Sequence, residues 1–138
     1  MKLIEMIDVS RSFGEGELKI EALKTTNISI KAGEFVAVIG PSGSGKSTFL
    51  TITGGLQTPS SGKVLINGKP FSEVTEKKRA KLRFEEIGFI LQASNLVPFL
   101  TVQDQLHLAN KVERSKVDKQ KRDELLKELG IFELKDKF

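Results

Sequence analysis

The sequence contains no cysteine, so neither a disulfide bond nor a thiolate metal site is possible. Long apolar runs are also missing. The longest, such as residues 35–39 and 87–91, are about a quarter of the ~20 residues that a membrane-spanning helix needs. The first ten residues do not resemble a signal peptide, because Glu5 and Asp8 interrupt any apolar centre. We therefore expect a chain that does not cross a membrane by itself and resides in the cytoplasm.

A strong excess of one charge is absent as well. The 138 residues include 22 lysines and arginines against 18 aspartates and glutamates, a formal net charge of +4. Because the acidic residues are scattered along the chain, no nucleic-acid partner is expected. The single histidine, His107, has no candidate metal partner in the sequence and is expected to be exposed. At this length the chain forms one domain at most, with enough residues to bury a core.

The pattern of apolar residues predicts a mixed α/β fold. Residues 3–13 alternate loosely and residues 20–30 repeat apolar side chains at alternate positions, which predicts an antiparallel region with residues 3–13 as an edge-type strand. Residues 35–39 form a continuous apolar run, which is typical of a strand covered on both faces in a parallel sheet. Residues 64–68 (Val-Leu-Ile-Asn-Gly) predict a hairpin, whose second strand is short because Pro70 follows.

Helical signals occupy most of the remaining sequence. Thr101 and Asp104 form a Thr-x-x-Asp cap, and Gly130 stands where a left-handed residue can end a helix. The basic stretch before residue 87 is expected to be a solvated helix. The predicted helices cover residues 46–53, residues 75–86, a stretch that starts at residue 102, and residues 118–129.

Residues 40–48, GPSGSGKST, fit the phosphate-binding pattern GxxxxGK[ST]. The motif follows a predicted strand and opens a predicted helix at Lys46, which is the arrangement that phosphate binding needs. Gly43 and Gly45 permit backbone angles that turn several amides toward one group of oxygens. Lys46 is expected to contact the β and γ phosphates, and the Ser47 hydroxyl to bind Mg²⁺. The motif alone leaves GTPases, kinases, helicases and transport ATPases open.

Longer stretches around this motif carry a family resemblance. Residues 33–48, followed by residues 54–62 (GGLQTPSSG), closely resemble the ATP-binding subunits of ABC transporters. Residues 87–92 (IGFILQ) are similar to the Q-loop of that family, and residues 9–14 (VSRSFG) to its A-loop. The resemblance implies an α/β fold, a partial P-loop NTPase core of the ABC ATPase type with an N-terminal antiparallel β subdomain.

Two stretches point to a branch within the family. Residues 14–17 and residues 95–102 look most like the branch that powers macrolide export, lipoprotein release and haem or peptide efflux. Residues 94–100 are unusually apolar for a loop, and the resemblance implies that they help form a groove for a cytoplasmic helix of the membrane subunit. Packing under the following helix is the alternative.

The resemblance also assigns roles to residues. Phe13 stacks on adenine, where many relatives have tyrosine, and the phenylalanine keeps the flat ring face. Gln92 lies near Mg²⁺ and the attacking water, so the catalytic residues are Lys46 and Gln92, and the metal-binding residues are Ser47 and Gln92. By themselves Phe13 could be a core residue and Gln92 a polar strand end. The implied nucleotide-binding residues are Phe13, Gly40, Pro41, Ser42, Gly43, Ser44, Gly45, Lys46, Ser47 and Thr48.

Later elements of the family are missing from the sequence: its Leu-Ser-Gly-Gly-Gln signature, its strand ending in Asp-Glu, and its switch histidine. We therefore expect residues 1–138 to be the N-terminal portion of a single ABC ATPase nucleotide-binding domain, inactive by itself. The parent is expected to bind ATP and Mg²⁺, pair with a second ATPase subunit, and hydrolyse ATP to drive export through a separate permease at the inner face of the membrane.

Other functions remain open on the residues alone. One alternative is a soluble GTPase or small-molecule kinase, against which Phe13 and Gln92 argue. Another is a soluble ABC protein that acts on nucleic acid or ribosomes, against which the lack of a basic stripe counts. A third is that the chain only binds nucleotide.

Overall fold

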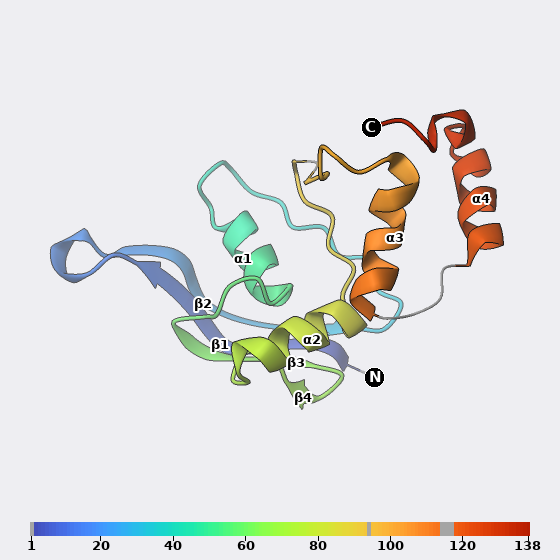
Figure 1. Ribbon diagram of the computed structural model, residues 1–138. Coiled ribbons are helices and arrows are strands. Elements are labelled where there is room, and N and C mark those ends of the chain that lie inside the picture. Colours follow the sequence, from blue (N-terminus) through green and yellow to red (C-terminus); the bar gives the residue numbers. More distant parts are fainter. Residues whose placement is uncertain (1, 94, 114–117) are drawn as a thin grey trace. The chain divides into compact units, whose positions relative to one another are not determined.

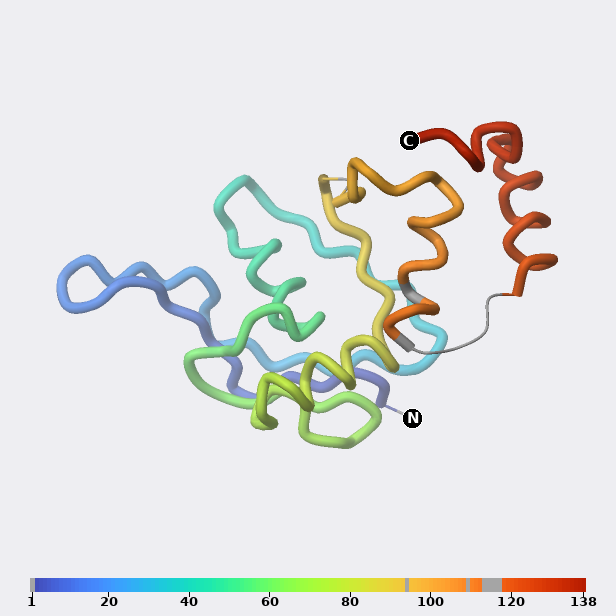
Figure 2. Tube along the Cα trace, viewed as in Figure 1, coloured from blue at the N-terminus to red at the C-terminus, as the bar shows by residue number. Residues whose placement is uncertain are grey.

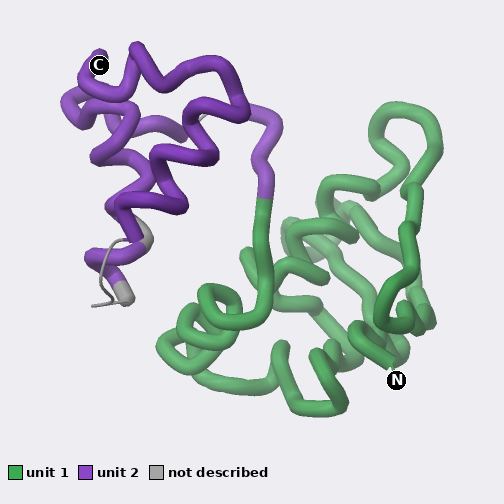
Figure 3. Tube along the Cα trace, turned by 90° about the vertical axis from the view of Figure 1, so that its right-hand side faces the viewer, with its two compact units in different colours: residues 1–89 green, residues 90–138 purple. Residues whose placement is uncertain are grey.

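The computed structural model describes residues 2–93, 95–113 and 118–138 (Figure 1). The chain divides into two compact units, residues 1–89 and residues 90–138 (Figure 3). The first unit contains β1 (Lys2–Phe13), the 3-10 turn η1 (Gly16–Leu18), β2 (Ile20–Lys31), α1 (Lys46–Thr53), β3 (Ser61–Ile66), β4 (Lys69–Pro70) and α2 (Glu76–Glu86). The second contains α3 (Val102–Glu113), α4 (Lys119–Glu128) and the 3-10 turn η2 (Phe132–Leu134). Across the described residues, no helix has the length and apolar character to cross a membrane.

The strands form one antiparallel sheet in the order β2-β1-β3-β4. Figure 2 shows β1 and β2 as two long strands running side by side. The prediction of an edge position for β1 is wrong, because β1 pairs on both sides: Met6 faces Ile28 of β2 and Val64 of β3. The second partner comes from much later in the sequence, so the local pattern of residues 3–13 could not reveal it.

The predicted hairpin is confirmed at the β3–β4 connection. Asn67 and Gly68 both have positive φ, 51° and 73°, as a two-residue turn of this kind requires. The second strand is two residues long and ends at Pro70. The turn fixes the register that places Val64 and Ile66 on the buried face of the sheet.

The core of the first unit lies between the sheet and α1. Phe49 and Ile52 are three residues apart, so they lie on one face of the helix and pack together against the strands. The hydroxyl of Thr53 donates to the Phe49 carbonyl at 2.7 Å, which satisfies this buried polar group. Leu82 of α2 packs partly buried against the same cluster. The buried apolar side chains are Met6, Val9, Phe49, Ile52, Val64, Ile66 and Phe71.

Residues 35–39 do not form the predicted buried strand. They have no strand conformation, and the side chains of Phe35 and Ile39 are 98% and 89% exposed. A parallel strand needs neighbours that supply hydrogen bonds, and the described residues place no strand beside this segment. Residues 87–91 are likewise outside any strand. The apolar run therefore predicted a buried environment that this structure does not provide.

Helix α2 was expected to be solvated, and one of its arginines is instead buried. Arg79 is 8% exposed, and its side chain donates to the Ser72 carbonyl at 3.2 Å and pairs with Glu76. Arg83 reaches the C-terminal end of α1, where it donates to the Gly55 carbonyl at 2.7 Å. Long basic side chains can bury their aliphatic parts while their charged ends bind oxygen atoms. The number of basic residues therefore did not predict that Arg79 is buried.

The second unit confirms the predicted helix caps. The hydroxyl of Thr101 donates to the Asp104 carboxylate at 2.7 Å and accepts from the Asp104 amide at 3.3 Å. Asp118 caps α4 by accepting from the Lys121 amide at 3.0 Å, and Gly130 takes the left-handed conformation just after the helix. The buried residue of α4 is Leu126.

Candidate nucleotide-binding site

The predicted phosphate motif forms an exposed loop that leads directly into α1. Helix α1 begins at Lys46 as predicted, and Gly45 precedes it with φ 88°, a left-handed value. The amide of Phe49 donates to the Gly45 carbonyl at 2.8 Å, which closes the first turn of the helix. Gly40 and Gly43 also have positive φ, 154° and 79°. The glycines therefore take the backbone angles for which the motif needs them.

The amides at the start of α1 are free to bind an anion. Within the described residues, the amides of Gly43, Lys46, Ser47 and Thr48 have no hydrogen-bond acceptor. Unpaired amides at a helix N-terminus carry a partial positive charge and suit phosphate oxygens. No acidic side chain lies in the first turn of α1 to compete with such a ligand. The donor set thus fits a polyphosphate.

The ammonium group of Lys46 folds back over the loop. Its Nζ donates to the carbonyl oxygens of Gly40, at 2.8 Å, and Pro41, at 2.7 Å. These bonds hold the positive charge of Lys46 at the loop. A phosphate oxygen bears more negative charge than a carbonyl oxygen, so it is the stronger partner for this ammonium group.

Phe13 lies near this loop through the pairing of β1 with β2. Gly45 lies against Ala22 of β2, since a Cβ on Gly45 would be 2.4 Å from the Ala22 carbonyl oxygen. Phe13 pairs with Ile20, two residues along β2, which is about 7 Å at the rise of a strand. The Phe13 side chain is 41% exposed. The structure therefore places the backbone of Phe13, an exposed residue, near the phosphate loop within the same unit.

One contact of Phe13 was not foreseen from the sequence. The guanidinium group of Arg11 lies over the Phe13 ring, 4.6 Å from its centroid. Arg11 also donates through Nη1 to the Thr58 carbonyl at 3.0 Å. The spacing of Arg11 and Phe13, two residues apart on a predicted strand, was the available signal because such residues share a face.

Gln92 and the apolar loop belong to the second unit. Gln92 is exposed, and its place beside Mg²⁺ remains a prediction. In the apolar stretch, residue 94 lies outside the described residues, while Leu96 and Phe99 are 66% and 76% exposed. These two side chains are available for a partner, whereas Val97 and Leu100 are partly buried.

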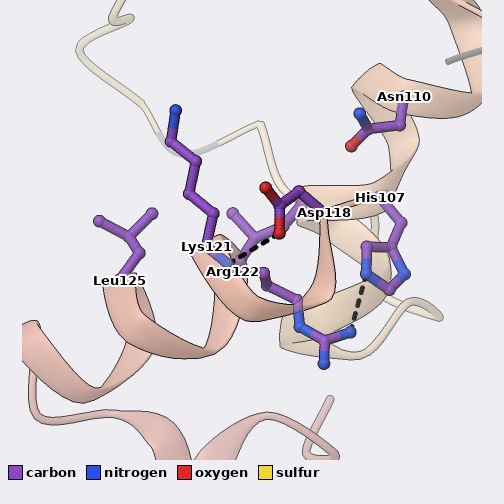
Figure 4. Close-up of a pocket in the computed structure, with 7 residues that line it drawn as sticks. His107, Asn110, Asp118, Lys121, Arg122 and Leu125 are labelled. Atoms are coloured by element: carbon purple, nitrogen blue, oxygen red, sulfur yellow. Dashed lines mark hydrogen bonds between the residues drawn. The ribbon is translucent and has the colours of Figure 1, made fainter. Parts of the chain in front are cut away.

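The expectation that His107 is exposed is wrong. His107 is partly buried at a hollow of about 260 Å³ between α3 and α4, and its Nε2 lies 2.9 Å from Nη1 of Arg122 (Figure 4). Lys121 and Asp118 line the same hollow. Among the described residues, no group of His, Cys, Asp and Glu side chains could hold a metal ion. The hollow is therefore lined by apolar as well as charged side chains, and the described residues offer no metal-binding cluster there.

Comparison with known proteins identifies the family. The ABC transporter family matches residues 23–138. HrtA of Staphylococcus haemolyticus, named as a hemin import ATP-binding protein, is 44% identical over 93% of this chain and 58% of its own length. MacB of Marinobacter nauticus, named as a macrolide export ATP-binding/permease protein, is 45% identical over 77% of this chain and 16% of its own length.

A solved structure supports the same assignment. The dimeric ATP-binding cassette MJ0796, in a post-hydrolysis state with ADP and Pi, matches with a TM-score of 0.79 and 37% identity over 87% of this chain and 52% of that chain. The chain thus spans little more than half the length of HrtA and of this cassette. The family match excludes a soluble GTPase or small-molecule kinase. The chain belongs to the ABC transporter family, as part of an ATP-binding subunit.

Proposed function

We propose that this chain is the MgATP-binding portion of an ABC transporter ATPase subunit. The observation that carries the proposal is the loop at residues 40–48, which combines unpaired amides, a left-handed Gly45 and the Lys46 ammonium group. These groups all belong to the loop or to the first turn of α1. A polyphosphate with a compensating cation is the ligand that this combination of donors suits best.

Each residue of the site has a distinct proposed task. Lys46 exchanges its bonds to the Gly40 and Pro41 carbonyls for the β and γ phosphate oxygens of ATP, and the free amides of α1 hold the same phosphates. The exposed hydroxyl of Ser47 supplies an oxygen ligand to Mg²⁺, which prefers such ligands. Phe13 offers its exposed ring face to adenine. Gln92 is proposed to report on the γ phosphate and the attacking water.

The activity of the whole protein is a wider proposal. Relatives extend well beyond the part that matches this chain, and the structural relative is a dimer with ADP and Pi. We propose that the parent hydrolyses MgATP as a dimer of two ATPase subunits, whereas the 138-residue chain binds nucleotide without turnover. Mg²⁺ supplies charge neutralisation of the phosphates when it is bound.

The membrane partner is proposed to dock on the second unit. The exposed side chains of Leu96 and Phe99 can pack against an apolar helix face of a separate permease, which would keep the subunit at the inner face of the membrane. The names of the relatives differ in direction, because HrtA is named for import and MacB for export. We propose export, on the likeness of residues 14–17 and 95–102 to the exporter branch. These names give no support to a role on nucleic acid or ribosomes.

The phosphate site is tested by equilibrium binding of MgATP to the chain and to Lys46→Ala. We expect the substitution to weaken MgATP binding at least tenfold, because the ammonium group places a positive charge directly at the loop. Lys63→Ala is the matched control, since Lys63 is an exposed lysine of β3. Equal affinities for Lys46→Ala and Lys63→Ala, in proteins with unchanged thermal unfolding, would contradict the proposed site.

A further inference from the structure

We propose that Arg11 is a positioning residue for the adenine base: its guanidinium group lies over the Phe13 ring, 4.6 Å from the centroid, and the proposal assigns the opposite ring face to the base. The inference rests on the proposed role of Phe13 as the adenine platform. It adds a second residue to the base site, and it assigns the ring faces: one face to the protein and the other to the ligand.

The backbone holds Arg11 in the position that this role requires. Arg11 and Phe13 are two residues apart on β1, so their side chains leave the strand on the same side. Nη1 of Arg11 donates to the Thr58 carbonyl at 3.0 Å, which anchors the guanidinium group to the segment between α1 and β3. Nε of Arg11 is buried, with no hydrogen-bond partner among the described residues. The planar group is therefore held by one carbonyl and one ring.

Phe13 needs such support because it lies near the end of its strand. Its side chain is 41% exposed, and a phenylalanine has no hydroxyl group with which to fix the ring by a hydrogen bond. A cation over one face restrains the ring and draws electron density toward itself, which favours stacking of an electron-rich purine on the other face. The arginine thus supplies an orientation that a hydroxyl group cannot supply here.

The strand pairing also connects Arg11 indirectly to the phosphate loop. Arg11 pairs in the sheet with Leu23 of β2, and the Leu23 side chain is 3.8 Å from the position of a Cβ on Gly45. The proposed stacking residue Phe13 and the loop residue Gly45 therefore lie next to neighbouring positions of the same strand pair, β1 and β2. We expect loss of Arg11 to weaken binding of the base more than binding of the phosphates. The guanidinium group contacts the Phe13 ring, and none of the hydrogen bonds described for it involves a residue of the loop.

The test compares two ligands, MgATP and magnesium tripolyphosphate, which lacks the base. Equilibrium affinities are measured for the unchanged chain, Arg11→Ala, Arg11→Lys, Phe13→Ala and the double variant. We expect Arg11→Ala to weaken MgATP about threefold and to leave tripolyphosphate unchanged, the size expected for a partly exposed cation over a ring. Arg11→Lys should recover part of the loss. In the Phe13→Ala background, Arg11→Ala should have no further effect on MgATP.

Arg83→Ala is the matched control, because Arg83 also donates to a backbone carbonyl, that of Gly55, and stacks on no aromatic ring among the described contacts. It should leave the ratio of the two affinities unchanged. Circular dichroism and thermal unfolding show whether each variant is folded, and the ratio of affinities within one variant does not depend on its folded fraction.

The opposing outcomes are distinct. An equal loss for both ligands in Arg11→Ala would show a general charge effect, and tighter MgATP binding would show that the guanidinium group occupies the face needed by the base; either result overturns the proposal. If Phe13→Ala weakens MgATP selectively while Arg11→Ala changes neither ligand, only the role of Arg11 fails. If Phe13→Ala affects both ligands equally, the adenine platform itself fails. Failure of Lys46→Ala to weaken either ligand would instead remove the phosphate site.

Discussion

Gly45 of the phosphate loop lies directly against Ala22 of β2: a Cβ at Gly45 would stand 2.4 Å from the Ala22 carbonyl oxygen. Real Cβ atoms do not approach a backbone oxygen so closely, and a backbone carbonyl of a paired strand cannot easily move aside. The contact therefore determines how near the loop and the start of α1 lie to the sheet. A side chain at this position would push the amides of Lys46 and Ser47 away from their present place.

This contact predicts different effects for two glycines of one loop. Gly43→Ala would place an alanine at a left-handed φ of 79°, and the new Cβ would lie in open space. The unfavourable φ alone should lower the free energy of unfolding by about 1 kcal/mol. Gly45→Ala adds the collision with Ala22, so we expect a larger loss of stability and a loss of MgATP binding of at least tenfold. Urea unfolding and equilibrium binding measure the two effects. Similar values for both variants would contradict the close approach.

Ser47 predicts a specific dependence on Mg²⁺. If its hydroxyl group is a metal ligand, Ser47→Ala should reduce the gain in ATP affinity that Mg²⁺ produces, while affinity measured with EDTA stays the same. Ser47→Thr keeps the hydroxyl group and is the conservative control, which should retain the gain. A Mg²⁺ effect of the same size in Ser47→Ala would show that the metal ion has other ligands.

The cap of α3 predicts a loss of stability that depends on pH. The hydrogen bond from the Thr101 hydroxyl lowers the pKa of the Asp104 carboxyl group below its ordinary value. Because the pKa is lower in the folded state, the contribution is complete above the ordinary pKa of aspartate, about 3.9, and is lost as the pH falls through the folded value. Thr101→Val should therefore destabilise α3 at pH 7, and destabilise it less at pH 3.

Thr75 provides the control for this pH effect. Thr75 caps α2 by accepting from the Lys78 amide at 3.4 Å, with a lysine instead of a carboxylate at the third helical position. Thr75→Val should cost a similar amount at pH 7 without the same decrease at pH 3. Urea unfolding at both pH values, followed by the hydrogen exchange of α2 and α3 amides, distinguishes the two helices. An equal pH dependence of the two variants would remove Asp104 as the cause.

Elements whose signals are local could be predicted from the sequence. The Lys46 start of α1, the Asn67-Gly68 turn, the Thr101 cap and Gly130 after α4 all depend on residues within one or two turns of chain. Capping and turn formation need no distant partner, because they satisfy backbone groups nearby. The structure agrees with the sequence at these positions for that reason.

Features that depend on distant partners could not be predicted in the same way. Residues 35–39 carry the composition of a buried strand, yet a strand also needs neighbours, and composition does not identify them. The burial of Arg79 and the contact of His107 with Arg122 likewise depend on carbonyl and side-chain partners from other elements. Charge and isolation in the sequence suggested solvent exposure for both, which was wrong.

The candidate site also contains one part that local sequence predicts and another part that depends on distant residues. Residues 40–48 are contiguous, so their spacing alone predicts the free amides at the start of α1 and the position of Lys46. The proximity of Phe13 to this loop needs the β1–β2 register, and the cation over its ring also needs the Thr58 carbonyl. Arg11 was therefore absent from the predicted site, although it stands only two residues from a residue that was included.

The exposure of residues 35–39 has a consequence for the behaviour of the chain in a cell. An extended apolar segment at the surface is what chaperones and proteases encounter on unfolded proteins, even where the rest of the molecule is well packed. The phenyl ring of Phe35, at 98% exposure, is the most accessible part of that segment. Contact of another polypeptide surface with this stretch would remove that apolar surface from water, which is a favourable change in free energy.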